Sequence, residues 1–173
     1  LWYNPGQEKV MIALKVEDVK TFTSKLFLKE DFDSFLVKEV NIVTYNNFSI
    51  DGHIRQGYYT DEELEANQIE SFSSWKVLRP VCFSLIKGKK LPGSFHIVLL
   101  LPPSDTEKFA FASGSGISSE QIQGLYLNIR YEDGALYCVT GTSLNFFTMD
   151  KALENEWDKA VAKFMRSHEI ICT

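Results

Sequence analysis

The sequence is poor in the residue types that define several specialised protein classes. Among 173 residues there are three cysteines, five prolines and ten glycines, and the glycines follow no triplet period. These numbers exclude a collagen-like fibre and a small domain held together by several disulfide bonds. The longest apolar run, residues 97–101, is far shorter than the ~20 residues that a membrane-spanning helix needs, so we expect no membrane partner.

Positive charge is also scarce. Eighteen basic residues stand against 23 acidic ones, which gives a net charge of −5. A nucleic-acid-binding protein gathers Lys and Arg on one face to replace the counterions of phosphates, and these totals disfavour that class. No basic segment followed by an apolar one stands at the start, so we expect no signal peptide and a cytoplasmic location.

The cysteines are odd in number and widely spaced, at Cys82, Cys138 and Cys172. This pattern fits reduced thiols better than a disulfide framework or a zinc site. Cys82 and Cys138 occur on apolar faces, so we expect them to be buried and unreactive. Cys172 should be more exposed, but it has no adjacent His or Lys that would activate it.

What the chain does have is apolar surface, with 45% hydrophobic and 13% aromatic residues, enough for a folded core. We interpret residues 1–10 as an N-terminal arm or an expression remnant, and residues 11–173 as a single α+β domain. Strand patterns follow one another without regularly alternating helices. They predict a mainly antiparallel sheet of about five to seven strands, with N-terminal, middle and C-terminal helices packed on it.

Local patterns give the expected elements. The alternation at 125–131, followed by Asp133-Gly134, predicts a β-hairpin with a two-residue turn that places Ile129 opposite Cys138. Further strands are expected at 11–16, 37–45, 48–52 and 94–101, and helices beginning near residues 17, 60 and 73. Pro80 complicates the third helix, which either kinks there or begins there.

The last expected helix covers residues 151–168. Its apolar residues step by three or four, so one face must be covered by another part of the protein. The 125–138 hairpin is the nearest apolar surface in the sequence. We expect Trp157 to be buried against it as a structural residue, outside any ligand site.

One pair of residues points to chemistry. Asp51 and His53 stand on either side of Gly52, and they share a face if the strand continues through the glycine. His96, on another strand, could complete an acid–base set with them. The alternative is an ordinary turn Asp and two partly exposed histidines. Neither a metal-spaced pair such as H-E-x-x-H nor a cofactor motif occurs, so no metal or cofactor is expected.

The one basic cluster combines Lys87, Lys89 and Lys90 with Arg79 nearby, and it is a candidate anion-binding site. Lysines also gather at helix C-termini because of the helix dipole, which is the interpretation we favour. The loop at 113–116 is rich in Ser and Gly but lacks the lysine of a phosphate-binding loop, so we expect an ordinary surface loop.

Three stretches together resemble a known family: residues 75–80 running into 86–90, the hairpin at 124–131 with residues 140–143, and the helix that contains Trp157. The resemblance is to a family of single-domain bacterial proteins of unknown function. It covers nearly the whole chain from residue 11 onward and implies no activity or ligand.

The leading hypothesis is therefore a non-catalytic binding or accessory protein. A protein partner is one option for what it binds. The alternative is a small hydrolase-type or metal-assisted enzyme that uses Asp51, His53 and His96. A third hypothesis is contact with an anion or nucleic acid through Lys87, Lys89 and Lys90. The first two hypotheses are distinguished by whether His53 and His96 lie in one pocket, as an enzyme would require.

Overall fold

The computed structural model describes residues 9–88 and 90–173. In this part of the chain the strands are β1 (Lys9–Lys15), β2 (Leu36–Val43), β3 (Asn47–Asp51), β4 (Ser94–Leu100), β5 (Ile122–Glu132) and β6 (Ala135–Leu144). The helices are α1 (Val19–Phe27), α2 (Asp61–Ala66), α3 (Trp75–Ile86), α4 (Pro103–Ser113) and α5 (Ala152–Ser167), with a short 3-10 turn, η1 (Ser119–Gln121).

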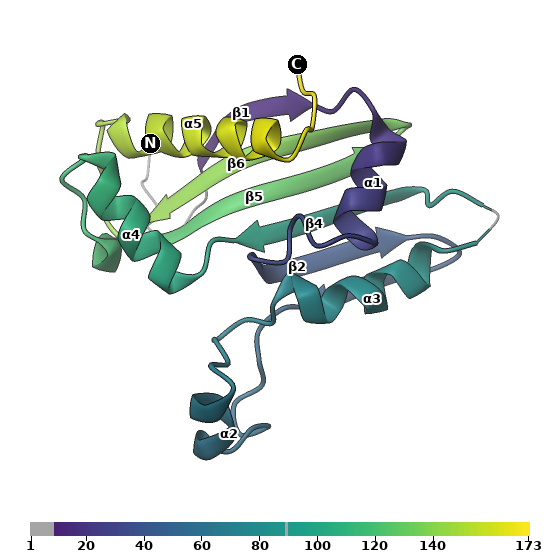
Figure 1. The fold of residues 1–173 in the computed structure, drawn as a ribbon, viewed down its shortest axis with the longest axis horizontal. Helices are drawn as coiled ribbons and strands as arrows, with labels where there is room; N and C mark the ends of the chain where they lie inside the picture. The colour runs from purple at the N-terminus through teal and green to yellow at the C-terminus, as the bar shows by residue number, and fades with distance from the viewer. Residues whose placement is uncertain (1–8, 89) are drawn as a thin grey trace.

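The six described strands form one sheet in the order β1-β6-β5-β4-β2-β3, and every neighbouring pair is antiparallel. Figure 1 shows α1, α3, α4 and α5 on one face of this sheet, while α2 lies on a segment that projects from it. The predicted α+β architecture is therefore confirmed, and the strand number falls within the expected range.

The helix-covered side, here called the inner face, holds the main core. Phe95, Ile97 and Leu99 of β4 alternate onto this face and are buried among helix residues. Trp157 of α5 is only 4% exposed, and its indole N–H donates to the carbonyl of Tyr126 at 3.0 Å. The expected burial of Trp157 against the hairpin sheet is confirmed.

The opposite side, here called the outer face, carries the alternate residues of the same strands. It includes Asn41 of β2, Ser49 of β3, and His96 of β4, which the strand register places in one row. A small apolar cluster also lies on this face, formed by Leu36, Phe72, Val98, Leu100 and Tyr126. The outer face is therefore polar at the β2–β3–β4 end and partly apolar beside it.

The β5–β6 hairpin has the predicted register. Ile129 pairs with Cys138, and Asp133 and Gly134 have φ angles of 52° and 78°, as a type I′ turn requires. In α3 the Ser74 hydroxyl caps the helix by accepting from Val77 N–H, and the helix runs through Pro80. The alternative in which this helix begins at Pro80 is therefore wrong.

The sequence patterns did not predict α4, which begins at Pro103, directly after the strand that the two prolines end. Residues 1–8 of the expected N-terminal arm lie outside the described residues, whereas Lys9 already belongs to β1. The division at residue 10 stays a prediction. No helix in the described ranges is both long and apolar enough to cross a membrane.

Candidate functional site

A β-bulge in β2 places Lys38 on the outer face. The pairing of β2 with β4 shifts between Val37 and Glu39, so Lys38 is the extra residue. Bulges of this kind change the direction of the side chains beside them. The Lys38 ammonium lies 4.7 Å from the ring centroid of Tyr126, on the outer face. The bulge therefore directs a cation across β4 toward β5.

Gly52 lets the chain leave β3 in close contact with this bulge. Its N–H donates to the Lys38 carbonyl at 2.9 Å, and its own carbonyl accepts from Ser73 N–H at 2.8 Å. A Cβ at residue 52 would lie 1.8 Å from the Val37 carbonyl oxygen, which no side chain tolerates. The absence of a side chain thus fixes the positions of the two residues that flank Gly52.

Those flanking residues, Asp51 and His53, are in direct contact. Asp51 Oδ1 accepts from His53 Nδ1 at 2.7 Å and from its backbone N–H at 3.0 Å. A carboxylate can only accept, so Nδ1 carries a proton, and in the neutral ring Nε2 is then the acceptor. The backbone N–H and then the ring of His53 lower the pKa of Asp51. The His53 ring also packs on Phe72 at 4.2 Å between centroids.

His96 reaches the same side of the sheet from β4. It pairs across the strands with Asn41, and its Nε2 lies 3.2 Å from Asn128 Oδ1. The Asn128 amide nitrogen donates to the Val139 carbonyl at 3.3 Å, which fixes the oxygen toward His96. Because that oxygen accepts, His96 donates from Nε2 and keeps Nδ1 as its second polar atom.

These side chains border one cavity of about 440 Å³, here called the outer cleft. It brings together the three candidates of the sequence analysis and adds residues that the analysis missed. Asp51 and His53 have 72% and 57% of their side chains exposed, so the cleft is open to water. Its polar lining includes Lys38, Asn41, Ser49, Asp51, His53 and His96.

Within the outer cleft, polar atoms are already organised. The Asn41 amide donates to Ser49 Oγ at 2.9 Å and to Asn47 Oδ1 at 2.6 Å. Donors, acceptors and charges of both signs therefore stand side by side. Among residues 9–88 and 90–173, no group of three His, Cys, Asp or Glu residues is placed to hold a metal ion. The geometry suits hydrogen bonding and proton transfer, and gives no support to the metal-assisted alternative.

The sequence held a signal for Lys38 that the pattern analysis did not use. Residues 36–43 read Leu-Val-Lys-Glu-Val-Asn-Ile-Val, in which two consecutive polar residues interrupt the alternation. Such an interruption is typical of a bulge, because a bulge places two neighbouring residues against one partner. Asn41 and Ser49 gave no comparable signal, since polar residues on an outer face are common.

The described members of the basic cluster, Arg79, Lys87 and Lys90, have different surroundings. Arg79 makes two hydrogen bonds to Asp33, at 2.9 and 2.8 Å, and this carboxylate raises the pKa of Arg79. Lys87 follows the end of α3, eight residues and about 12 Å along the helix from Arg79. Lys87 and Lys90 are exposed, and Lys89 lies outside the described residues. Arg79 thus joins α3 to the loop after α1.

The three thiols are not activated. Cys82 and Cys138 are fully buried, as predicted, and Cys172 is half-buried. Burial raises the pKa of Cys82 to about 12, and it also raises the pKa values of Cys138 and Cys172. At neutral pH all three are protonated, and a protonated thiol is a poor nucleophile.

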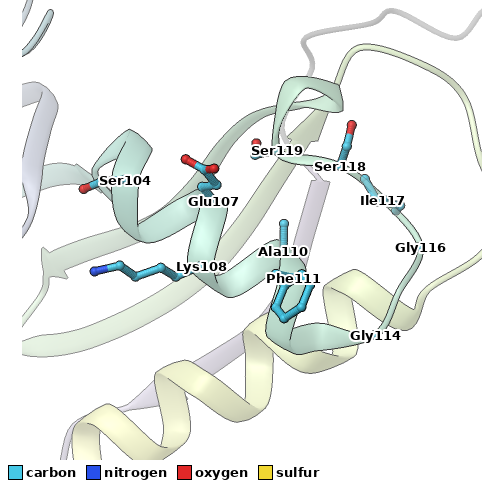
Figure 2. Close-up of a pocket in the computed structure, with 10 residues that line it drawn as sticks. All are labelled: Ser104, Glu107, Lys108, Ala110, Phe111, Gly114, Gly116, Ile117, Ser118 and Ser119. Atoms are coloured by element: carbon cyan, nitrogen blue, oxygen red, sulfur yellow. The ribbon is translucent and has the colours of Figure 1, made fainter.

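A larger cavity, of about 890 Å³, lies between α4 and residues 114–119 (Figure 2). Its charged residues diverge: the side chains of Glu107 and Lys108 extend from different sides of α4. Between them, the lining includes the small side chain of Ala110. This cavity therefore does not focus polar groups as the outer cleft does.

Comparison with known proteins assigns the chain to a family. A family model described as "Family of unknown function (DUF5721)" matches residues 25–172. No curated protein and no solved structure matches the chain. The resemblance drawn from residues 75–90, 124–143 and the Trp157 helix is confirmed for the family, while a bacterial origin stays a prediction. The chain belongs to the DUF5721 family, whose function is unknown.

Proposed function

We propose that this protein binds a small polar ligand in the outer cleft, and that the ligand is a zwitterion such as a free amino acid. The observation that carries the proposal is that Lys38, Asp51 and His53 border one cleft. The β2 bulge places Lys38 there, and the close contact of Gly52 with that bulge places Asp51 and His53. The Lys38 ammonium would meet the ligand's carboxylate. Asp51 and Glu39 would meet its ammonium group.

The other polar residues of the cleft support this ligand class. The Asn41 amide, the Ser49 hydroxyl and the His96 ring supply further hydrogen-bond donors and acceptors. Open polar clefts gain affinity mainly from such placed hydrogen bonds, since little apolar surface is buried there. We therefore expect weak binding, with a Kd of about 0.1–1 mM.

The test follows the ring signals of His53 and His96 by NMR while free amino acids are added one at a time. At least one should move both signals in a saturable way. Its N-acetyl form, which lacks the positive charge, and its amide form, which lacks the negative charge, should bind about tenfold more weakly. Lys38→Met should cause a similar loss, whereas the control Lys87→Met should not. The proposal is overturned if no amino acid moves both signals.

A second candidate, the hydrolase-type enzyme, rests on the Asp51–His53 contact, which leaves His53 Nε2 free to accept a proton. Recovery of the bound amino acid derivative unchanged, together with equal p-nitrophenyl acetate hydrolysis by the wild type and His53→Gln, would exclude it. A cytoplasmic location also stays part of the proposal, and the three free thiols support it.

A further inference from the structure

A second cavity lies on the inner face of the sheet, away from the outer cleft. Its volume is about 290 Å³, and it is bordered by α4, α5 and the segment that joins α1 to β2. Its floor includes Leu127, a fully buried residue of β5. We call it the aromatic cavity, because four of its lining side chains are Phe35, Phe109, Trp157 and Phe164.

Edge-to-face contacts hold these four rings. Phe109 and Trp157 have centroids 5.5 Å apart at 82°, and Phe35 and Phe164 have centroids 5.4 Å apart at 77°. The hydrogen bond from Trp157 to the Tyr126 carbonyl fixes the indole further. Aromatic rings carry partial negative charge on their faces, so a set of rings around one cavity favours a cation.

Asp105 is the one charged residue recorded in the lining of this cavity. It stands in the first turn of α4, where the helix dipole stabilises its negative charge. The helix dipole explains why an acidic residue is favourable in this turn. It does not explain why the acidic residue borders a cavity. Its carboxylate makes no hydrogen bond or ion pair with any residue in the ranges 9–88 and 90–173.

We infer that the aromatic cavity binds a small organic ammonium ion, with its methylated nitrogen among the rings and Asp105 as its counter-ion. A methylated nitrogen loses less hydration on burial than a primary ammonium, and its methyl groups pack on apolar walls. A neutral apolar molecule would gain no charge attraction from Asp105, and Asp105 would repel an anion. This assignment gives Trp157 a place in a ligand site, contrary to the sequence-based expectation.

The test uses choline and its neutral carbon analogue, in which a tert-butyl group replaces the trimethylammonium group. The two have nearly the same shape, so any difference in affinity reports the charge. Binding is followed through the indole N–H signal of Trp157 by NMR, and Trp157→Phe identifies that signal. Choline should shift the signal in a saturable way with a Kd of about 1–10 mM, and the neutral analogue should bind about tenfold more weakly.

Two variants separate the charge from the rings. Asp105→Asn keeps the side-chain shape and should weaken choline binding about tenfold, whereas the control Glu107→Gln, on the same helix but outside this cavity, should not. Phe109→Leu keeps an apolar wall and should weaken choline more than the neutral analogue. Equal affinity for the two compounds, an unaltered Asp105→Asn variant, or no shift of the Trp157 signal would each overturn the inference.

Discussion

The two faces of the sheet are built from alternate residues of the same strands, yet one holds the packed core and the other carries an open polar cleft. In β4, Phe95, Ile97 and Leu99 are almost fully buried beneath the helices, while His96 between them borders the outer cleft. On the inner face each side chain is held by several packed neighbours. In the outer cleft, polar side chains such as His96 and Asn41 are held by only one or two hydrogen bonds each.

This difference has a physical consequence for mutation. Inner-face residues contribute mainly through burial and packing, so their removal should unfold the protein. Exposed polar residues of the outer cleft contribute little to stability, because water replaces their partners when they are lost. Replacing an exposed polar residue of the outer cleft should therefore change binding there without changing stability. The following predictions test that division, beginning with the largest effect.

Replacing Trp157 by alanine should cost about 3–5 kcal/mol of unfolding free energy, since a large buried ring and a hydrogen bond are lost. Chemical denaturation measures this directly. The matched control is Tyr137→Ala on the outer face of β6, where the tyrosine is 38% exposed and the loss should be about 1 kcal/mol or less. A thermal midpoint of Trp157→Ala within a degree or two of wild type would mean that α5 is a detachable arm.

Gly52→Ala should lower the free energy of unfolding by about 1–3 kcal/mol. The new Cβ would clash with the backbone carbonyl of Val37 and force residue 52 away from β2. The same movement should displace Asp51 and His53, so binding at the outer cleft should fall as well. Gly93→Ala is the control: its Cβ would lie 3.5 Å from the Val43 carbonyl oxygen, an ordinary contact. Equal midpoints for the two variants would show that the crossing relaxes without strain.

The buried thiols predict a loss of stability at alkaline pH. The pKa of Cys82 is about 12 in the fold and about 8.5 in an unfolded chain, so unfolding releases its proton between these values. Stability is full below pH ~8.5 and falls as pH rises, by about 2 kcal/mol from Cys82 alone at pH ~10. Cys82→Ala should lose that much less than wild type between pH ~7 and ~10. The same alkaline loss in both proteins would contradict a buried, neutral thiol.

The fold could be predicted from the sequence wherever a local pattern permits only one arrangement of the chain. The Asp133-Gly134 turn fixed a register that places Ile129 opposite Cys138, because a two-residue turn permits only one alignment of apolar faces. Helix α4 was not predicted, because its buried residues, Thr106 and Ala110, are small and form no apolar stripe. Its opening proline also ends strands, and Pro103 serves here as the first helical residue.

The candidate site was predictable only in part, for a different reason. Asp51 and His53 are two residues apart, so local geometry sufficed to join them. His96 and Lys38 border the same cleft because of the strand order and the bulge, and both of these are set by tertiary packing. The aromatic cavity was not foreseen, since the spacing of Trp157 and Phe164 on α5 is that of any core-facing helix.

The smallest effect concerns the charge of Asp51. The backbone N–H of His53 contributes most to its lowered pKa, and the His53 ring contributes next. His53→Ala keeps the first donor and removes the second, so the pKa should rise toward its ordinary value without reaching it. NMR titration of the Asp51 carboxyl carbon measures the change. The pKa of Asp18, which hydrogen bonds from Thr21 lower, is the matched control and should stay the same.

The sign of the linked stability follows from that direction. A carboxyl whose folded pKa is lowered stabilises the fold above its unfolded pKa, and the contribution is lost as pH falls through the folded value. Because Asp51 is exposed, water screens this contribution and the acid-induced loss should be barely measurable. An unchanged Asp51 titration in His53→Ala would show that the ring does not hold the carboxylate in solution. The outer cleft would then lack the fixed acceptor at His53 Nε2 on which the hydrolase-type alternative depends.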